Sequence, residues 1–322
     1  MRLKVLTRDD VVSAVPMSAA IDAVAGAYSE LSRGRAQSPV RLGLHTPLGT
    51  SLFMPGYLEE SGALGAKIVS IFQKNAERGL PSIHGIVLLL DPETGVPMAL
   101  MDGTYLTALR TGAGSGVATR ALAREDARVL TVYGAGGQAR AQIEAVRAVR
   151  DIREVRIVSR TGESARILAA ELEGVEARAV DDPAEAALGA DVICAATTSA
   201  TPVFPHDAAS AGVHVNGVGS FKPDMQEIAG ELLLRARVFV DARDAALEEA
   251  GDLIIPIQQG VFGEDHIAAD IGEVLDGRAE GRTTRDQITY FKSVGNAVQD
   301  VAVALLAVRE AERKGLGQTI DL

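Results

Sequence analysis

The first hundred residues combine one helical pattern with several short apolar runs. Apolar and small side chains recur at helical spacing over residues 16–34, a segment that ends at a glycine and predicts an amphipathic helix. Residues 65–70 and 84–91 are rich in branched apolar side chains, as strands are. Residues 91–95 supply a turn, and residues 97–102 are expected to form the returning strand. This part of the chain is therefore predicted to be a mixed α+β unit.

From Ala127 onward the pattern changes to short apolar strands that alternate with helices. Residues 128–133 and 154–159 are expected strands, with a helix over residues 138–149 between them. Such alternation is typical of the α/β class, in which crossover helices connect the strands of a parallel sheet. Three further strands are expected, over residues 191–196, 213–218 and 237–241.

A helical pattern returns over residues 297–314, after the α/β segment. Its apolar face needs a surface to pack on, and we expect this helix to return to the first part of the chain. A chain of 322 residues is about right for two domains. We therefore predict one domain from residues 1–115 and 297–322 and a second from residues 116–296, with the passages near residues 111–124 and 292–296.

The composition limits the possible partners. Hydrophobic residues make up 47% and charged residues 23% of the chain, a balance that allows a real core. The formal net charge of −11 disfavours nucleic acid and anionic membranes. Cys194 is the single cysteine and the five histidines lack ligand spacing, so neither a disulfide nor a metal site is predicted. No segment has the pattern of a signal peptide or a membrane span, and a cytoplasmic location is expected.

A glycine-rich segment directly follows the strand expected over residues 128–133 and opens the next helix. Gly134 permits a tight turn, Gly136 allows the backbone to approach a pyrophosphate, and Ala139 keeps the helix close to the strand. The helix N-terminus also attracts an anion. This context predicts a Rossmann domain that binds a dinucleotide. The whole segment reads Gly134-Ala135-Gly136-Gly137-Gln138-Ala139.

The second strand of this domain ends in Ser159-Arg160-Thr161. An acidic side chain at this place normally accepts a hydrogen bond from the ribose 2′-hydroxyl of NAD. Here no carboxylate repels a 2′-phosphate, and a guanidinium and two hydroxyls are available to bind it. NADP(H) is therefore the preferred cofactor, with NAD(H) possible. The alternative is that Arg160 stacks on the adenine or points to solvent. Thr197 and Thr198 follow a later strand, where a Rossmann loop contacts the dinucleotide.

Seven segments together resemble the ornithine cyclodeaminase/mu-crystallin family, in order and over nearly the whole chain. They are Phe53-Met54-Pro55, Gly65-Ala66-Lys67, Met101-Asp102-Gly103, Ala108-Leu109-Arg110-Thr111, Gly134-Ala135-Gly136, Val218-Gly219-Ser220-Phe221-Lys222-Pro223-Asp224 and Phe291-Lys292-Ser293-Val294-Gly295.

The resemblance implies a homodimer whose N-terminal domain, completed by the C-terminal helix, binds substrate and dimerises. It also implies that Val218 and the turn with Lys292, Val294 and Gly295 approach the cofactor, with Val294 packing on the nicotinamide. Members of the family include cyclodeaminases, alanine dehydrogenases, reductases of imino acids and ketimines, and mu-crystallins.

By the same resemblance, Arg41, Lys67 and Arg110 correspond to the cations that bind the substrate carboxylate. An amino or imino acid needs its carboxylate held by a fixed cation while its α-carbon faces the nicotinamide. The sequence after Arg110 begins with Thr111 and is able to bring backbone N–H groups to a phosphate or carboxylate.

One departure bears on the reaction. Cyclodeaminases resemble one another in placing an aspartate two residues after Gly219, where this chain has Phe221. Phenylalanine can neither take a proton nor bind an ammonium group as an acid does, so cyclodeamination loses its key group.

The leading hypothesis is the reduction of an α-imino acid or cyclic ketimine to an L-amino acid, with Arg41 and Arg110 holding the carboxylate. Lys67 either joins them as an anchor or donates a proton toward the imine nitrogen. Alanine dehydrogenase chemistry fits the same site. The alternatives are ornithine cyclodeamination to proline and ammonia, and a non-catalytic carrier of NADPH and small ligands.

Overall fold

The computed structural model of the protein describes residues 2–322, without the side chain of Ala76. The chain divides into two compact units. The first runs from the start of the chain to Arg110 and resumes over Asn296–Leu322, and the second is Thr111–Gly295.

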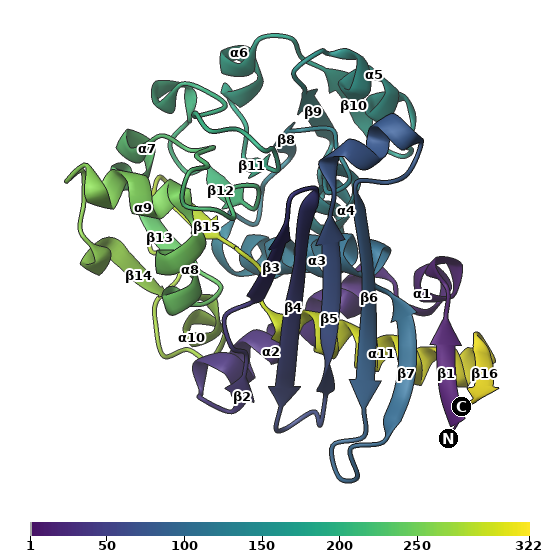
Figure 1. Cartoon of the computed structure of the whole chain (residues 1–322). Coiled ribbons are helices and arrows are strands. Elements are labelled where there is room, and N and C mark those ends of the chain that lie inside the picture. The colour runs from purple at the N-terminus through teal and green to yellow at the C-terminus, as the bar shows by residue number, and fades with distance from the viewer. Residues whose placement is uncertain (1) are drawn as a thin grey trace. The chain divides into compact units, whose positions relative to one another are not determined.

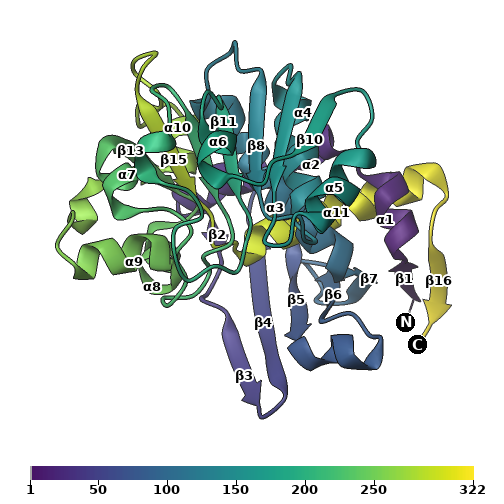
Figure 2. The same cartoon turned by 90° about the horizontal axis from the view of Figure 1, so that it is seen from above.

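The first unit is built on a mixed sheet in the order β16-β1-β7-β6-β5-β4-β2, with β3 paired to β4. Its neighbours are antiparallel except for β1 and β7, which are parallel. The two ends of the chain lie side by side because β1 pairs with β16 (Figure 1 and Figure 2). The strands are β1 (Arg2–Leu6), β2 (Ala36–Gln37), β3 (Leu42–Thr46), β4 (Gly49–Leu58), β5 (Leu64–Ile71), β6 (Ile83–Leu90), β7 (Pro97–Asp102) and β16 (Gln318–Asp321).

Helices cover one face of this sheet. α11 (Ala297–Lys314) packs on β4, β5, β6 and α2 (Met17–Ser32), as its apolar face requires (Figure 1). The short α1 (Arg8–Ala14) also contacts α11, and η1 (Gln73–Arg78) joins β5 to β6. α11 ends at Gly315, whose φ of 67° supplies the left-handed C-terminal cap that glycine adopts without strain.

The other face of the sheet is an apolar surface, here called the outer sheet face. Along β5, Gly65, Lys67 and Val69 are buried, whereas the alternate residues that point the other way are only partly buried. The register aligns two rows of side chains across the strands of this face, Leu42, Phe53, Ile68 and Ile86 in one row and Pro55, Ala66, Leu88 and Leu100 in the next.

The second unit contains an all-parallel sheet in the order β10-β9-β8-β11-β12-β15-β13-β14. Its strand order reverses between β8 and β11, the arrangement of a doubly wound Rossmann domain. The strands are β8 (Val129–Tyr133), β9 (Glu154–Val158), β10 (Glu176–Ala179), β11 (Val192–Ala195), β12 (His214–Gly217), β13 (Ala236–Val240), β14 (Ile267–Asp270) and β15 (Ile288–Lys292). The connecting helices are α4 (Ala139–Val149), α5 (Glu163–Ala170), α6 (Pro183–Ala187), η2 (His206–Ala208), α7 (Gly230–Arg235), α8 (Arg243–Glu249), α9 (Gly251–Gln258), η3 (Glu264–His266) and α10 (Ile271–Leu275).

The predicted fold class is confirmed, and the expected strands and helices are present to within one or two residues at their ends. The sequence pattern did not reveal α3 (Gly103–Leu122), which contains the passage from Arg110 to Thr111 between the units. Its glycines and small residues blur the helical period, since they give no clear apolar stripe.

Within residues 2–322, no single helix is long and apolar enough to be a candidate membrane span. The pair α1 and α2 meets the length and hydropathy criteria only when taken together, and it is bent by 86°.

Candidate active site

The glycine loop follows β8 at the switch point of the parallel sheet. Gly134 has a φ of 104°, and a Cβ there would lie 2.5 Å from the carbonyl oxygen of Ala196, so only glycine fits. Gly136 and Gly137 are exposed, and a Cβ at either would meet no atom within 4 Å. Within residues 2–322, the backbone N–H groups of Ala135 to Gln138 have no hydrogen-bond acceptor. This cradle of free amides at the start of α4 suits a diphosphate.

The end of β9 presents a cation to solvent. Arg160 and Thr161 are exposed, whereas the Ser159 hydroxyl accepts a hydrogen bond from the Ala165 N–H of α5. A second cation, Arg166, was not expected from the sequence. It lies beside the same turn, since a Cβ at Gly162 would be 3.2 Å from its guanidinium. Arg166 is paired with Asp181, so Arg160 is the less constrained cation.

The loops after β11 and β12 carry the other residues expected to face a dinucleotide. Thr198 is exposed, and Val218 is buried directly after β12. The Thr197 N–H donates to the carboxylate of Glu227, which lies behind these loops.

A second buried carboxylate holds the turn that follows β15. The Asp241 carboxylate accepts hydrogen bonds from the Ser293 hydroxyl and the Gly295 N–H, both at 2.8 Å. Burial raises the pKa of Asp241, and its backbone partners around Val294 lower it. The turn is therefore fixed by its own unit, with Val294 6% exposed.

Two residues sit differently from the sequence expectation. The Lys292 side chain is fully buried, and its Nζ donates to Asp252 at 3.1 Å, so a contact with a cofactor at this position falls to the backbone. Thr111 and the two residues after it lie in the interior of α3, whose i→i−4 bonds use their N–H groups, so those amides are not free to bind an anion. The sequence could not show the burial of Lys292 because it depends on tertiary packing, and the helix around Thr111 leaves no clear apolar stripe in the sequence.

In the first unit, Lys67 and Arg110 share one carboxylate. Lys67 Nζ lies 2.9 Å from Asp300, and Arg110 Nε lies 3.0 Å from the same side chain. Lys67 is 1% exposed, Arg110 5% and Asp300 0%. β5 supplies the lysine, α3 the arginine and the first turn of α11 the aspartate, so three distant segments build the cluster.

The cluster carries more positive than negative charge. Burial lowers the pKa of Lys67 to about 7, with Arg110 as the next cause, and Arg41 also lowers it, whereas Asp300 raises it. Arg41 is therefore close enough to act on Lys67 through its charge. Lys67 and Arg110 contact one buried anion and Arg41 adds a third positive charge near Lys67, so an anionic ligand would restore the balance.

Residues that sequence analysis did not name orient Arg110. Gln299 Oε1 accepts from Arg110 Nη1 at 3.0 Å, and Gln299 Nε2 donates to the Tyr28 hydroxyl at 2.7 Å. The side-chain amide of Asn296 is buried and has no hydrogen-bond partner within residues 2–322, which is costly without a ligand. The only signal in the sequence was the place of Asn296 and Gln299 at the start of the last helix.

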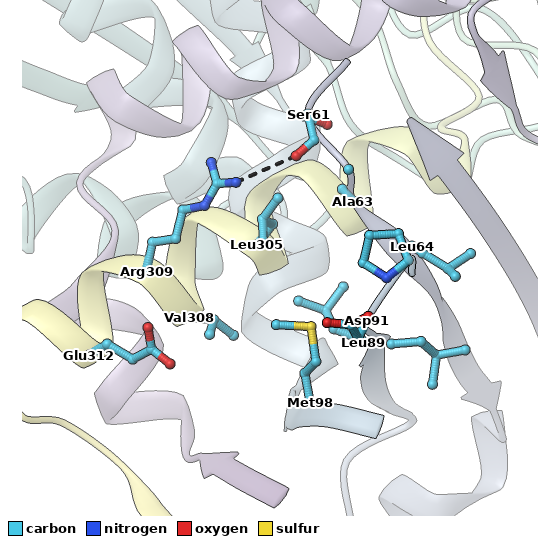
Figure 3. Close-up of a pocket in the computed structure, with 13 residues that line it drawn as sticks. Ser61, Ala63, Leu64, Leu89, Asp91, Met98, Leu305, Val308, Arg309 and Glu312 are labelled. Atoms are coloured by element: carbon cyan, nitrogen blue, oxygen red, sulfur yellow. Dashed lines mark hydrogen bonds between the residues drawn. The ribbon is translucent and has the colours of Figure 1, made fainter. Parts of the chain in front are cut away.

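A separate hollow of about 290 Å³ lies along the C-terminal half of α11 (Figure 3). Leu305 and Val308 of the helix and Leu89 and Met98 of the sheet line it, and Arg309 donates to the Ser61 carbonyl oxygen at its rim. It contains none of the residues discussed above, and its charged members are exposed or only partly buried.

The doubly wound sheet with its free-amide loop, together with the buried cation cluster, defines the class of an NAD(P)-dependent oxidoreductase. The model of the ornithine cyclodeaminase/mu-crystallin family matches residues 1–315, so the chain belongs to this family. The resemblance seen in the sequence is thereby confirmed.

Similar proteins span the whole chain. Delta(1)-pyrroline-2-carboxylate reductase of Bacillus cereus is 41% identical, over 98% of this chain and 99% of that protein. The structure of Thermococcus litoralis Delta(1)-pyrroline-2-carboxylate reductase, in complex with NADH and L-proline, has a TM-score of 0.95 at 39% identity, covering 99% of this chain and all of that one. An archaeal alanine dehydrogenase dimer with bound NAD has a TM-score of 0.94 at 36% identity, covering both chains fully.

Proposed function

We propose that this protein reduces the C=N bond of an α-imino acid, cyclic or acyclic, to give an L-amino acid with NADPH or NADH as reductant. The observation that carries the proposal is the buried cluster of Lys67, Arg110 and Asp300, with Arg41 nearby. Its excess positive charge suits a substrate carboxylate. The names of the relatives, reductases of cyclic imino acids and an alanine dehydrogenase, support the same chemistry.

The bound dinucleotide supplies the hydride, and Ala135 to Gln138 of the glycine loop would hold its diphosphate. The chain's own residues do the rest. Arg41 and Arg110 bind the carboxylate, and Gln299 keeps the Arg110 guanidinium in one orientation. Lys67, with a pKa of about 7, can release a proton to the imine nitrogen at neutral pH, and Asp300 holds the ammonium group in place.

In this proposal the first unit binds the substrate and the second binds the cofactor. NADPH is preferred, because Arg160 and Thr161 offer a cation and a hydroxyl to a 2′-phosphate and no acidic side chain stands at the end of β9. A cytoplasmic location is part of this proposal, on the sequence argument alone.

A cyclic five-membered imine, pyrroline-2-carboxylate, is the substrate we favour, because two of the reported relatives carry that activity in their names. Alanine dehydrogenase chemistry is the second candidate, since pyruvate and ammonia form an imine with the same carboxylate. Ornithine cyclodeamination is disfavoured by Phe221, which is half-buried in the loop after β12 and carries no acidic group.

Initial rates test this assignment. The purified protein is given NADPH or NADH with pyrroline-2-carboxylate, piperideine-2-carboxylate, or pyruvate plus ammonia, and loss of reduced cofactor is followed. The highest kcat/KM is expected with a cyclic imine. Proline formed from ornithine at a comparable rate would overturn the assignment, and tight NADPH binding with no turnover of any imine would favour the carrier.

We further propose that the protein is a homodimer that pairs through the outer sheet face. Apolar side chains such as Ile86 (45% exposed) and Leu42 (62% exposed) stand in continuous rows there, and monomers rarely leave such surfaces uncovered. The dimeric state of the archaeal alanine dehydrogenase supports a dimer, and the choice of face rests on the exposed apolar rows.

A further inference from the structure

A buried carboxylate in the second unit collects the backbone of two neighbouring loops. Glu227 is fully buried. Its Oε1 accepts from the Thr197 N–H at 2.5 Å, and its Oε2 accepts from the N–H groups of Gly219 and Ser220 at 2.7 and 3.1 Å. Thr197 lies just beyond β11 and Gly219 just beyond β12, and these strands are adjacent in the sheet. One side chain therefore ties together the carboxyl ends of both strands.

The backbone at Gly219 packs tightly against the Glu227 carboxylate. A Cβ at Gly219 would lie 2.5 Å from both carboxylate oxygens, so the backbone can approach them only as glycine. Glu227 has no exposed surface, so solvent does not reach its carboxylate. If the carboxylate were removed, each of the three N–H groups would lose its acceptor.

Glu227 is itself fixed by a second buried carboxylate. The Glu227 N–H and the Ile228 N–H both donate to Asp252, at 2.7 and 3.0 Å. The other oxygen of Asp252 accepts from Tyr290 and Lys292 of β15. The set of Glu227, Asp252, Tyr290 and Lys292 thus braces β11, β12 and β15 from behind their carboxyl ends, where doubly wound sheets bind their ligands.

We propose that Glu227 is a positioning residue for the dinucleotide. Its ionised carboxylate holds the loops after β11 and β12 in the shape that receives the cofactor, without touching the cofactor itself. The inference rests on the proposed dinucleotide-dependent reduction, and it assigns a role to a residue outside the glycine loop and the cation cluster.

Charge makes this arrangement sensitive to pH. Burial and the neighbouring charge of Asp252 raise the pKa of Glu227 to about 7, whereas Lys292 and the hydrogen bond from Thr197 lower it. Asp252 of α9, with Lys292 and Tyr290 of β15, are the charged and titratable groups that face it. Protonation turns one accepting oxygen into an O–H donor that opposes N–H donors, so the loops should loosen as the pH falls below about 7.

The test compares Glu227→Gln with a matched control. Asp191→Asn removes a carboxylate that also accepts from two backbone N–H groups, those of Arg128 and Val129, but at the amino ends of the strands. NADH is the probe, because its phosphates do not titrate between pH 6 and 8. Its Kd is measured by fluorescence at both pH values, and the exchange rates of the Thr197, Gly219 and Ser220 amides are measured by NMR without cofactor.

For the wild type and for Asp191→Asn, we expect NADH to bind about tenfold more weakly at pH 6 than at pH 8. At pH 8, Glu227→Gln should bind NADH at least about tenfold more weakly than the wild type does, with no further weakening at pH 6. Its Thr197, Gly219 and Ser220 amides should exchange faster than those of the wild type. Wild-type affinity and an unchanged pH profile in a folded Glu227→Gln would overturn the proposal.

If Glu227→Gln fails to fold, amide exchange in the wild type still tests the proposed role of Glu227. After correction for intrinsic rates, the three amides should exchange faster at pH 6 than at pH 8, and equal protection at both would overturn the inference. A wild type that binds neither NADH nor NADPH would overturn the proposed function, whereas the exchange data test the role of Glu227 separately.

Discussion

Lys67 and Asp300 are separated by 233 positions in the sequence, yet the lysine Nζ lies 2.9 Å from the aspartate carboxylate in a fully buried contact. Arg110 shares the same carboxylate. Two cations around one anion make a site that is incomplete until another negative charge arrives, and the first three predictions below rest on this relationship.

Replacing Lys67 with methionine should lower kcat for imine reduction by about a hundredfold or more, because the proton donor is lost while the shape is retained. The measurement is kcat and KM by stopped-flow absorbance of the reduced cofactor. Lys67→Arg is the control that keeps the charge and should preserve KM better than kcat. An effect of Lys67→Met confined to KM would identify the lysine as an anchor instead.

The pH dependence of Lys67 has a definite sign. Its pKa falls from 10.5 to about 7 in the folded protein, so reductive kcat/KM should decline above pH 7 as the donor loses its proton. Between pH 7 and 10.5 the unfolded chain binds the proton that the folded protein releases, so this group makes stability rise with pH in that window. Urea unfolding at pH 7.5 and 9.5 of the wild type and Lys67→Met isolates the contribution. Equal pH dependence in both proteins would contradict it.

Asp300→Asn should destabilise the fold by about 3–5 kcal/mol, because it leaves two buried cations without a counter-charge. The free energy of unfolding is measured in urea at pH 7. Combining Asp300→Asn with Lys67→Met should recover part of the loss, since only one buried cation then remains. Asp9→Asn, in an exposed pair with Arg8, is the control and should cause no measurable change. A double variant as unstable as the sum of the singles would refute the coupling.

Arg160→Ala should weaken NADPH binding by about tenfold or more and leave NADH binding unchanged, because only NADPH carries the 2′-phosphate. Fluorescence titration with both cofactors gives the two Kd values. Arg153→Ala removes an exposed arginine from the other end of β9 and should change neither. Equal losses for both cofactors would mean that Arg160 does not discriminate between them.

Leu88→Arg places a charge in the middle of the outer sheet face and should convert a dimer into a monomer, measured by analytical ultracentrifugation. Leu188→Arg, at an exposed leucine of the second unit, is the control and should keep the oligomeric state. A wild type that sediments as a monomer, or a Leu88→Arg variant that stays dimeric, would contradict pairing through this face.

Much of the fold could be predicted from the sequence because its signals are local. The alternation after Ala127 fixed the α/β class, the period of residues 297–314 matched α11, and the glycines before α4 marked the dinucleotide loop. These features depend on neighbours within a few residues, so they survive in the sequence. α3 was missed because its many small residues leave no periodic apolar stripe, and so no local signal, in the sequence.

The tertiary structure alone decided which charges meet. Asp300 and Gln299 are ordinary polar residues of a C-terminal helix until α11 packs on the sheet and brings them to Lys67 and Arg110. Lys292, one residue of a recognisable motif, is turned inward to Asp252, and Glu227 gains three amide donors from two loops. Burial and partnership of a charge depend on segments that are distant in the chain, and no local pattern records them.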